Sequence, residues 1–281
     1  MYHALLLIIL CSLLINTDNS QTQQIELEQP AGQSFILSPM YNEDLNVKTG
    51  YGPETGKWFL SNKGGQIGFS MSGGYMKAGS DVSVKLAASI PDRNIRFRLS
   101  KLDNNLKPLS VLDEKIDSVD VAVPASYSNR LPEEQDAIYL LSAEVLGQNN
   151  EVEDTLLSVV YAPILEINSA MTLDKMQYTN LDIVTLNISN YGPTVIMLGK
   201  PYKFQKYNQS VWEDVPNRRA FTLEGIGLEP GKTYEQKVTV NDLEPGKYRI
   251  IKEVSIMDIH DTKEALTADF EVVSPEHFPN R

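Results

Sequence analysis

Short runs of alternating apolar and polar residues recur along the chain, with Gly, Pro, Asn and Asp between them. A period of two places successive side chains on opposite faces of a strand, so each run predicts a half-buried strand. No stretch past residue 20 has the apolar spacing of a capped helix. Strands at this spacing are typical of β-sandwiches, and we predict an all-β protein. The runs are DVSVKL (81–86), IRFRL (95–99), VDVAV (119–123), DIVTLNI (182–188), YEQKVTV (234–240) and YRIIKEV (248–254).

The two halves of the sequence repeat the order of these runs. YLLSAEV at 139–145 and YRIIKEV at 248–254 share Tyr, Glu and Val at a separation of 109 residues. Each is followed by a polar turn and a returning apolar strand. Upstream, the runs around Phe97 and Phe204 match at a similar separation. The repeat predicts two related sandwiches in tandem.

The pentapeptide LEPGK occurs at 228–232 and again at 243–247. Pro presets φ for a turn and Gly permits a positive φ, so each copy is predicted to reverse the chain between two strands. After the second copy, Tyr248 begins the penultimate strand, which is the arrangement of a tyrosine corner. Its hydroxyl is expected to bond back to the preceding backbone. Tyr139 is the predicted counterpart in the first half.

The second half, about residues 171–273, resembles the bacterial immunoglobulin-like domains of secreted and cell-surface proteins. The resemblance lies in the segments DIVTLNISNYG, GKPYKFQKYNQSVWEDVP, LEPGKTYEQKVTV and LEPGKYRIIKEV. It implies a sandwich of about seven strands, a role in display, spacing or adhesion, and no catalytic residues. The first half lacks the Pro-Gly turns, so its immunoglobulin-like fold is predicted from the internal repeat alone.

One apolar run, ALLLIILCSLLI at 4–15, precedes a polar stretch. It is too short to cross a bilayer core of about 30 Å but has the length of a signal-peptide core. The alternative is a lipoprotein signal in which Cys11 carries the lipid anchor, although such signals have a small residue just before the cysteine and this sequence has Leu10 there. The predicted organisation is a signal peptide at 1–22, an N-terminal extension at 23–56, sandwiches at 57–164 and 165–275, and a tail at 276–281.

Charge and cysteine usage exclude several kinds of site. The net charge of −12 and pI of about 4.8 argue against nucleic-acid binding, which needs clustered Lys and Arg. Cys11 is the sole cysteine, so no disulfide or cysteine-based metal site is expected once the signal is removed. The acidic turns at 148–154 and 258–264 are predicted to be solvated hairpin tips, and a cation at His260 is the disfavoured alternative. We predict no catalytic, metal or cofactor site.

Exposed aromatic side chains are the remaining candidates for recognition, because they stack on sugars or anchor a protein partner. Tyr207, Trp58 and Tyr127 are the candidates that we select. Phe204 and Trp212 are predicted to lie in the core. A protein or a glycan is the expected partner, and membrane contact is expected only through an N-terminal anchor.

Two functional hypotheses of different classes follow. The first is an exported, non-catalytic binding or spacer protein of the bacterial envelope or exterior, built from two immunoglobulin-like modules. The second is a small secreted hydrolase, or accessory domains of one, that acts on envelope polymers with Glu144 and Glu253 in a cleft. Because these two glutamates are equivalent in the repeat, a shared structural role is favoured over a catalytic pair.

Overall fold

The computed structural model describes residues 45–59, 63–118, 123–216 and 219–275. Its regular structure is almost entirely β, and the helix within these ranges is α1, Leu45–Thr49. The all-β prediction is therefore confirmed. The predicted signal peptide with Cys11, residues 23–44 of the extension, the tail at 276–281 and nearly all of the strand predicted at 119–123 lie outside the described residues.

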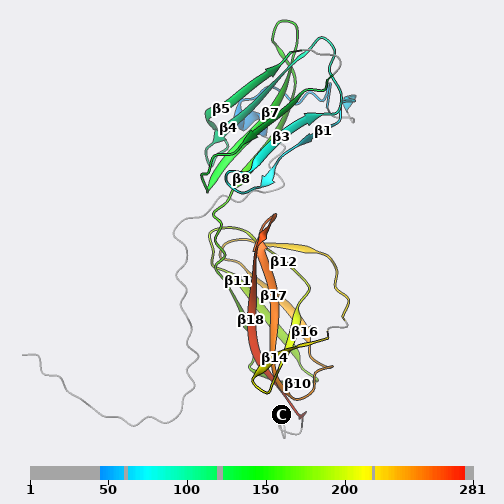
Figure 1. The fold of residues 1–281 in the computed structure, drawn as a ribbon, viewed down its shortest axis with the longest axis vertical. Helices are drawn as coiled ribbons and strands as arrows, with labels where there is room; N and C mark the ends of the chain where they lie inside the picture. The colour runs from blue at the N-terminus through cyan, green and yellow to red at the C-terminus, as the bar shows by residue number, and fades with distance from the viewer. Residues whose placement is uncertain (1–44, 60–62, 119–122, 217–218, 276–281) are drawn as a thin grey trace, which may run out of the picture.

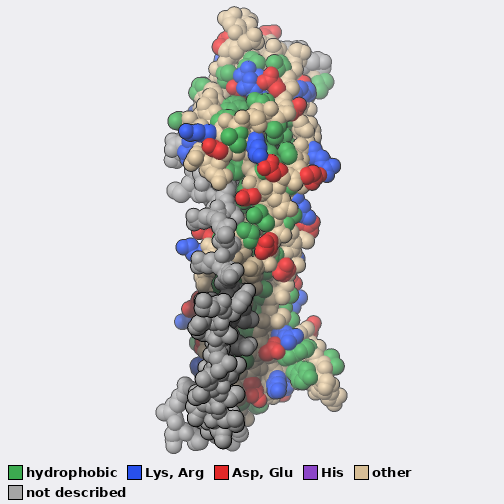
Figure 2. Space-filling model, turned by 90° about the vertical axis from the view of Figure 1, so that its left-hand side faces the viewer, with side chains coloured by type: hydrophobic (Ala, Val, Ile, Leu, Met, Phe, Trp, Pro, Cys, Tyr) green, Lys and Arg blue, Asp and Glu red, His purple; other side chains and the backbone are tan. Residues whose placement is uncertain are grey.

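The two halves of the chain lie end to end (Figure 1). On the face shown in Figure 2, acidic and basic side chains are interspersed and do not gather into a stripe of one sign. Within the described ranges, no helix is long and apolar enough to span a membrane.

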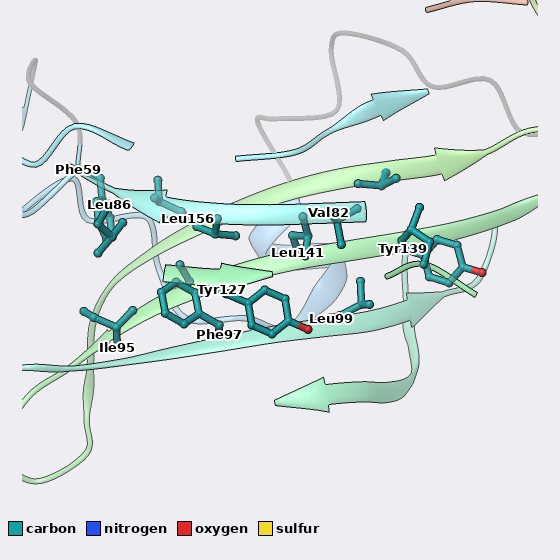
Figure 3. Close-up of a cluster of buried hydrophobic side chains, with 14 of the residues drawn as sticks. Phe59, Val82, Leu86, Ile95, Phe97, Leu99, Tyr127, Tyr139, Leu141 and Leu156 are labelled. Atoms are coloured by element: carbon teal, nitrogen blue, oxygen red, sulfur yellow. The ribbon is translucent and has the colours of Figure 1, made fainter. Parts of the chain in front are cut away.

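The first half is a two-layer sandwich. A sheet in the order β1-β3-β6 faces a sheet in the order β2-β8-β7-β4-β5. Side chains from both layers fill the space between them, and Phe97, Leu141 and Val82 are almost fully buried there (Figure 3). The strands are β1 Phe69–Met71, β2 Gly74–Tyr75, β3 Asp81–Leu86, β4 Asn94–Leu102, β5 Pro108–Asp117, β6 Ser126–Arg130, β7 Ala137–Leu146 and β8 Val152–Ala162.

The second half is also a two-layer sandwich. Its smaller sheet has the order β16-β11-β9, and its larger sheet contains β10-β18-β17 with β12-β15 and β13-β14 attached to β17. The core between them includes Leu186, Ile250 and Phe270. The strands are β9 Ser169–Leu173, β10 Gln177–Thr179, β11 Ile183–Asn190, β12 Ile196–Gly199, β13 Lys203–Asn208, β14 Val211–Val215, β15 Gly225–Leu228, β16 Thr233–Thr239, β17 Gly246–Ile256 and β18 Ile259–Val273.

The strand order is the same in both halves, as the internal repeat predicts. The sheet β1-β3-β6 corresponds to β9-β11-β16, and the order β2-β8-β7-β4 corresponds to β10-β18-β17 followed by β12 and β13. In each half the short strand at the sheet edge is parallel to the last strand. Tyr139 and Tyr248 lie on the equivalent strands β7 and β17, and both side chains face the core.

The two LEPGK copies do not form the same turn, contrary to the prediction. In the first, the Lys232 amide bonds to the Glu229 carbonyl and Gly231 has φ of 73°, so this copy reverses the chain. In the second, Gly246 already belongs to β17. The reversal comes earlier, where the Leu243 amide bonds to the Val240 carbonyl. The second copy therefore leads into a strand instead of turning between two.

Apolar contacts join the two halves. Val195 of the second half belongs to a buried cluster with Tyr75 and Tyr161 of the first, and Met257 at the tip of the β17–β18 hairpin packs against this cluster. Lys77 of the first half forms an ion pair with Asp261 beside that tip. Asp258, His260, Asp261 and Glu264 of the tip at 258–264 are exposed, as predicted, and it is Met257 before them that packs against the other sandwich.

Candidate functional site

Tyr248 makes the hydrogen bond that defines a tyrosine corner. Its hydroxyl donates to the Glu244 carbonyl at 2.8 Å, and its ring is buried in the core. Tyr139 occupies the equivalent strand, but its buried hydroxyl has no hydrogen-bond partner among the described residues. Burial raises the pKa of Tyr139 above its ordinary value. The predicted corner is thus formed at Tyr248, whereas Tyr139 is a core residue without the corner bond.

These two tyrosines allow a matched comparison. Tyr248→Phe is expected to lower the free energy of unfolding by about 1 kcal/mol, because it leaves the Glu244 carbonyl without its partner. Tyr139→Phe is expected to change it by less than about 0.5 kcal/mol, because no bond is lost. Urea unfolding of both variants measures the difference. Equal losses would contradict the distinction between the two sites.

Tyr127 is a core residue and not a partner-binding one. It is 3% exposed, stacks on Phe97 with ring centroids 5.8 Å apart, and donates its hydroxyl to Asp113. It lies on β6, whose alternation SYSNR looks polar in sequence. The prediction failed because an inward-facing tyrosine can bury its ring while its hydroxyl reaches a partner at the rim.

Trp58 is also tied into the first sandwich. Its indole nitrogen donates to Glu153 at 3.0 Å, and its ring packs against the core. Hydrogen bonds from Arg93, Lys57 and Trp58 lower the pKa of Glu153 to about 2. The acidic hairpin at 148–154 therefore anchors residues 56–59 to the first sandwich. The prediction of a solvated tip is wrong for Glu153 and for Asp154, which is 1% exposed.

The two glutamates of the hydrolase hypothesis do not share a cleft. Glu144 is buried on the outer face of the first large sheet and pairs with Arg96 at 2.7 Å and Arg98 at 3.3 Å. Glu253 is exposed on the second sandwich, 3.8 Å from the amines of both Lys203 and Lys263. Each carboxylate thus has its own cationic partners, and the two belong to different sheets.

His260 lies at the start of β18 and is exposed. Within the part of the chain that the structure describes, no three His, Cys, Asp or Glu side chains are grouped so as to hold a metal ion.

The exposed aromatic candidate, Tyr207, belongs to a cluster on the outer face of the second large sheet. The β13–β14 register pairs Tyr207 directly with Trp212, and their ring centroids are 5.0 Å apart. The Arg249 guanidinium lies 4.2 Å from the centroid of the Trp212 ring. Trp212 is half-buried on this outer face, so its placement in the core was wrong. Phe204 is buried in the core, as predicted.

This cluster forms one wall of a groove of about 570 Å³. Met176, which is 68% exposed, lines the groove beside β10. Polar side chains of β17, β18 and β10 also line it. They are Lys247, Arg249, Asp269, Glu271 and Gln177.

Hydrogen bonds hold this polar lining in place. Arg249 donates two bonds to Asp269, at 2.7 and 3.1 Å, and this ion pair raises the pKa of Arg249. Gln177 donates to Glu271 at 3.0 Å across the parallel β10–β18 pair. These bonds fix the orientation of Arg249, Asp269, Gln177 and Glu271, so the polar lining is preorganised before a ligand binds.

Sequence reasoning selected Tyr207 but missed Arg249, Met176 and the groove itself. These residues are distant in sequence. The pairing of β13 with β17 brings Tyr207 near Arg249, and the pairings of β10 with β18 and of β18 with β17 bring Met176 to the same face. The available signal was the alternation in KYRIIKEV, where Arg249 lies on the opposite face from Tyr248.

A second hollow, of about 660 Å³, lies on the same sheet beside β12 and β15. Aliphatic side chains such as Met197, Leu198 and Ile251 form much of its lining. It also contains aromatic rings, Tyr202 and Phe221 with centroids 5.0 Å apart, and ion pairs of Glu253 with Lys203 and Lys263. Because Tyr202 is only 6% exposed whereas Tyr207 is 41% exposed, we take the groove as the candidate site.

Comparisons with known proteins were made at three levels. No curated protein matches the chain. Fibronectin(III)-like modules of Clostridium thermocellum CbhA match at 12% identity, over 77% of this chain and 98% of that one, with a TM-score of 0.35. The Yersinia pseudotuberculosis adhesin InvE matches at 9% identity, over 73% of this chain and 58% of that one, with a TM-score of 0.33. At these scores the neighbours carry no information about ligands.

The family comparison concerns the half of the chain that holds the groove. A family model described as "Bacterial Ig-like domain" matches residues 165–271. This range includes the tyrosine corner, the β13–β14 hairpin and nearly all of β18. Residues 165–271 therefore form a bacterial Ig-like domain, the family that the sequence of the second half resembles.

Proposed function

We propose that the chain is an exported, non-catalytic binding protein of the bacterial envelope or exterior, and that the groove beside Tyr207 and Trp212 is its binding surface. The observation that carries this proposal is the Tyr207–Trp212–Arg249 cluster, in which Tyr207 is exposed and the other two side chains are half-buried. Trp, Tyr and Arg are the residues that most often dominate binding energy, and here they lie together, and no described segment of the chain covers Tyr207, which is 41% exposed.

The first sandwich contributes a fixed spacer. Its apolar contacts with Val195 and Met257 and the Lys77–Asp261 pair resist bending between the halves. A stiff connection keeps the groove, at the far end of the second sandwich, at a constant distance from the N-terminal side of the molecule (Figure 1). This arrangement suits a module that presents a binding surface away from an attachment point.

Export is proposed from the apolar run at 4–15 and from the family of the second half, and the structure does not describe that run. Mass spectrometry of the protein recovered from outside the cytoplasm tests it. A mature N-terminus between residues 18 and 23 is expected. A diacylated Cys11 would replace secretion by lipid anchoring, and an intact Met1 in the cytoplasm would contradict export.

Binding to the envelope is expected to depend on the groove. The labelled protein should sediment with envelopes isolated from the producing bacterium, and the double variant Tyr207→Ala/Trp212→Ala should lose at least tenfold of its affinity. Phe69→Ala is the matched control, because Phe69 is 43% exposed on the first sandwich, far from the groove. Equal binding by all three proteins would contradict the assignment of the groove.

A further inference from the structure

We infer that the ligand of this groove is an electrically neutral polysaccharide chain, an inference that rests on the proposed function and gives the substrate class of the same site. Two features carry it: an aromatic wall that offers a ring to stack on, and a polar lining whose charges cancel. The alternatives are a nucleic acid or charged polymer and a protein partner, and each fits the groove less well.

The wall presents the face of one exposed aromatic ring at low entropic cost. Tyr207 is 41% exposed, and its position is fixed by Trp212 at 5.0 Å, which is itself held by Arg249 at 4.2 Å. A pyranose ring has one face of axial C–H groups, which packs against an aromatic ring while the hydroxyls around its edge remain free for hydrogen bonds. Tyr207 provides the stacking ring, and Trp212 supports it.

The polar lining supplies donors and acceptors in equal measure. Lys247 and Arg249 donate hydrogen bonds, and Asp269 and Glu271 accept them. A sugar hydroxyl both donates and accepts hydrogen bonds, so a row of hydroxyls can pair with these donors and acceptors together. Because the carboxylates keep spare lone pairs after bonding Arg249 and Gln177, they accept further bonds from a ligand without breaking the existing ones.

The same lining disfavours the other two classes of ligand. Its two cations and two anions sum to zero, so it offers no counterion release to nucleic acid or to another charged polymer. The buried centres of protein interfaces are depleted in Lys, Asp and Glu, whereas three of the four charged residues here are of those types.

The extent of the groove fits a chain better than a single sugar. Its lining reaches from Met176 beside β10 to Trp212 on β14, across the strand order β10-β18-β17-β13-β14. Four spacings between neighbouring strands amount to roughly 19 Å. A chain crossing the strands would contact Tyr207 with one unit and the polar lining with the next.

The decisive experiment uses isolated envelopes treated in two ways before the labelled protein is added. Periodate cleaves the vicinal diols of sugars, and protease removes protein. We expect periodate to abolish binding, protease to leave it, and a change from low to high salt to alter the affinity less than twofold, because a neutral ligand releases few counterions. Loss of binding after protease alone, or a tenfold loss in high salt, would overturn the inference.

A fluorescence titration places the ligand at the groove. The chain has two tryptophans, so Trp58→Phe leaves Trp212 as the single indole reporter. Saccharides released from protease-treated envelopes are expected to change its emission in a saturable way, and adding Tyr207→Ala should weaken this response at least tenfold. An unchanged response in the Tyr207→Ala protein would overturn the placement.

The two proposals fail in different ways. If envelope binding is abolished by Tyr207→Ala/Trp212→Ala but is also lost after protease treatment, the polysaccharide inference is wrong while the binding function of the groove stands. If envelope binding is the same in the double variant and the wild-type protein, the proposed function itself fails, and the inference fails with it.

Discussion

Replacing Phe270 by alanine is expected to lower the free energy of unfolding of the second sandwich by about 3 to 5 kcal/mol. Phe270 is 3% exposed and lies at the centre of an aromatic group. Its ring centroid is 5.7 Å from that of Tyr248, 5.8 Å from Tyr178 and 5.9 Å from Phe204. Removing it opens a cavity between rigid rings that cannot collapse to fill the space.

Urea unfolding measured separately in each half checks this result. Trp58 reports on the first sandwich and Trp212 on the second, so single-tryptophan backgrounds distinguish their transitions. The Trp212 transition should move to lower urea in Phe270→Ala, and the Trp58 transition should move much less. Phe69→Ala, at a ring that is 43% exposed, is the control and should cost less than about 1 kcal/mol. A loss of that small size in Phe270→Ala would contradict the central role of this ring.

Asp154→Ala is expected to destabilise the first sandwich by about 3 kcal/mol. The carboxylate is 1% exposed and accepts hydrogen bonds from the backbone amides of Trp58 at 2.8 Å, Gly56 at 3.0 Å and Phe59 at 3.3 Å. Without it, buried amide donors lose their acceptor, and Phe59 is released from the core.

The Trp58 transition in urea measures this loss, with Asp81→Ala as the control because Asp81 is an exposed acid at the start of β3. Asp154→Asn retains an acceptor oxygen and should recover part of the stability. If Asp154→Ala and Asp81→Ala unfold at the same urea concentration, then Asp154 does not fasten residues 56–59.

The sequence was informative where a residue's environment is set by its own strand or turn. The alternation in β3, β4, β11, β16 and β17 predicted these strands, and the repeat predicted the shared strand order of the two halves. The Gly-x-Tyr spacing located Tyr248, because the corner bond spans only four residues, to Glu244. Such short-range features leave a local pattern.

Long-range features left no such pattern. Asp154 receives amides from residues about 96 positions earlier in the chain, and nothing in the polar stretch around it distinguishes a buried acid from a solvated one. Trp212 was expected in the core, but the pairing of β13 with β14 places it beside Tyr207 on the outer face. The groove likewise depends on the β13–β17 register.

The contact between the β17–β18 hairpin and the first sandwich is also a long-range feature that the sequence did not indicate. Asp258 and Asp261 suggested a solvated turn, and both are exposed, but Met257 beside them packs against the first sandwich. A single methionine in an acidic turn is a weak signal for an interface between domains, and its partner surface around Tyr75 and Tyr161 comes from residues that are distant in sequence.

The most direct test of ligand binding at the groove is amide hydrogen exchange of the protein with and without envelope fragments. Added protection is expected in the β13–β14 hairpin, Lys203–Asn208 and Val211–Val215, and at Gln177–Thr179 of β10, since these strands flank the groove. Protection confined to the first sandwich, or to the opposite sheet of β9, β11 and β16, would show that the envelope is bound elsewhere and would contradict the proposal.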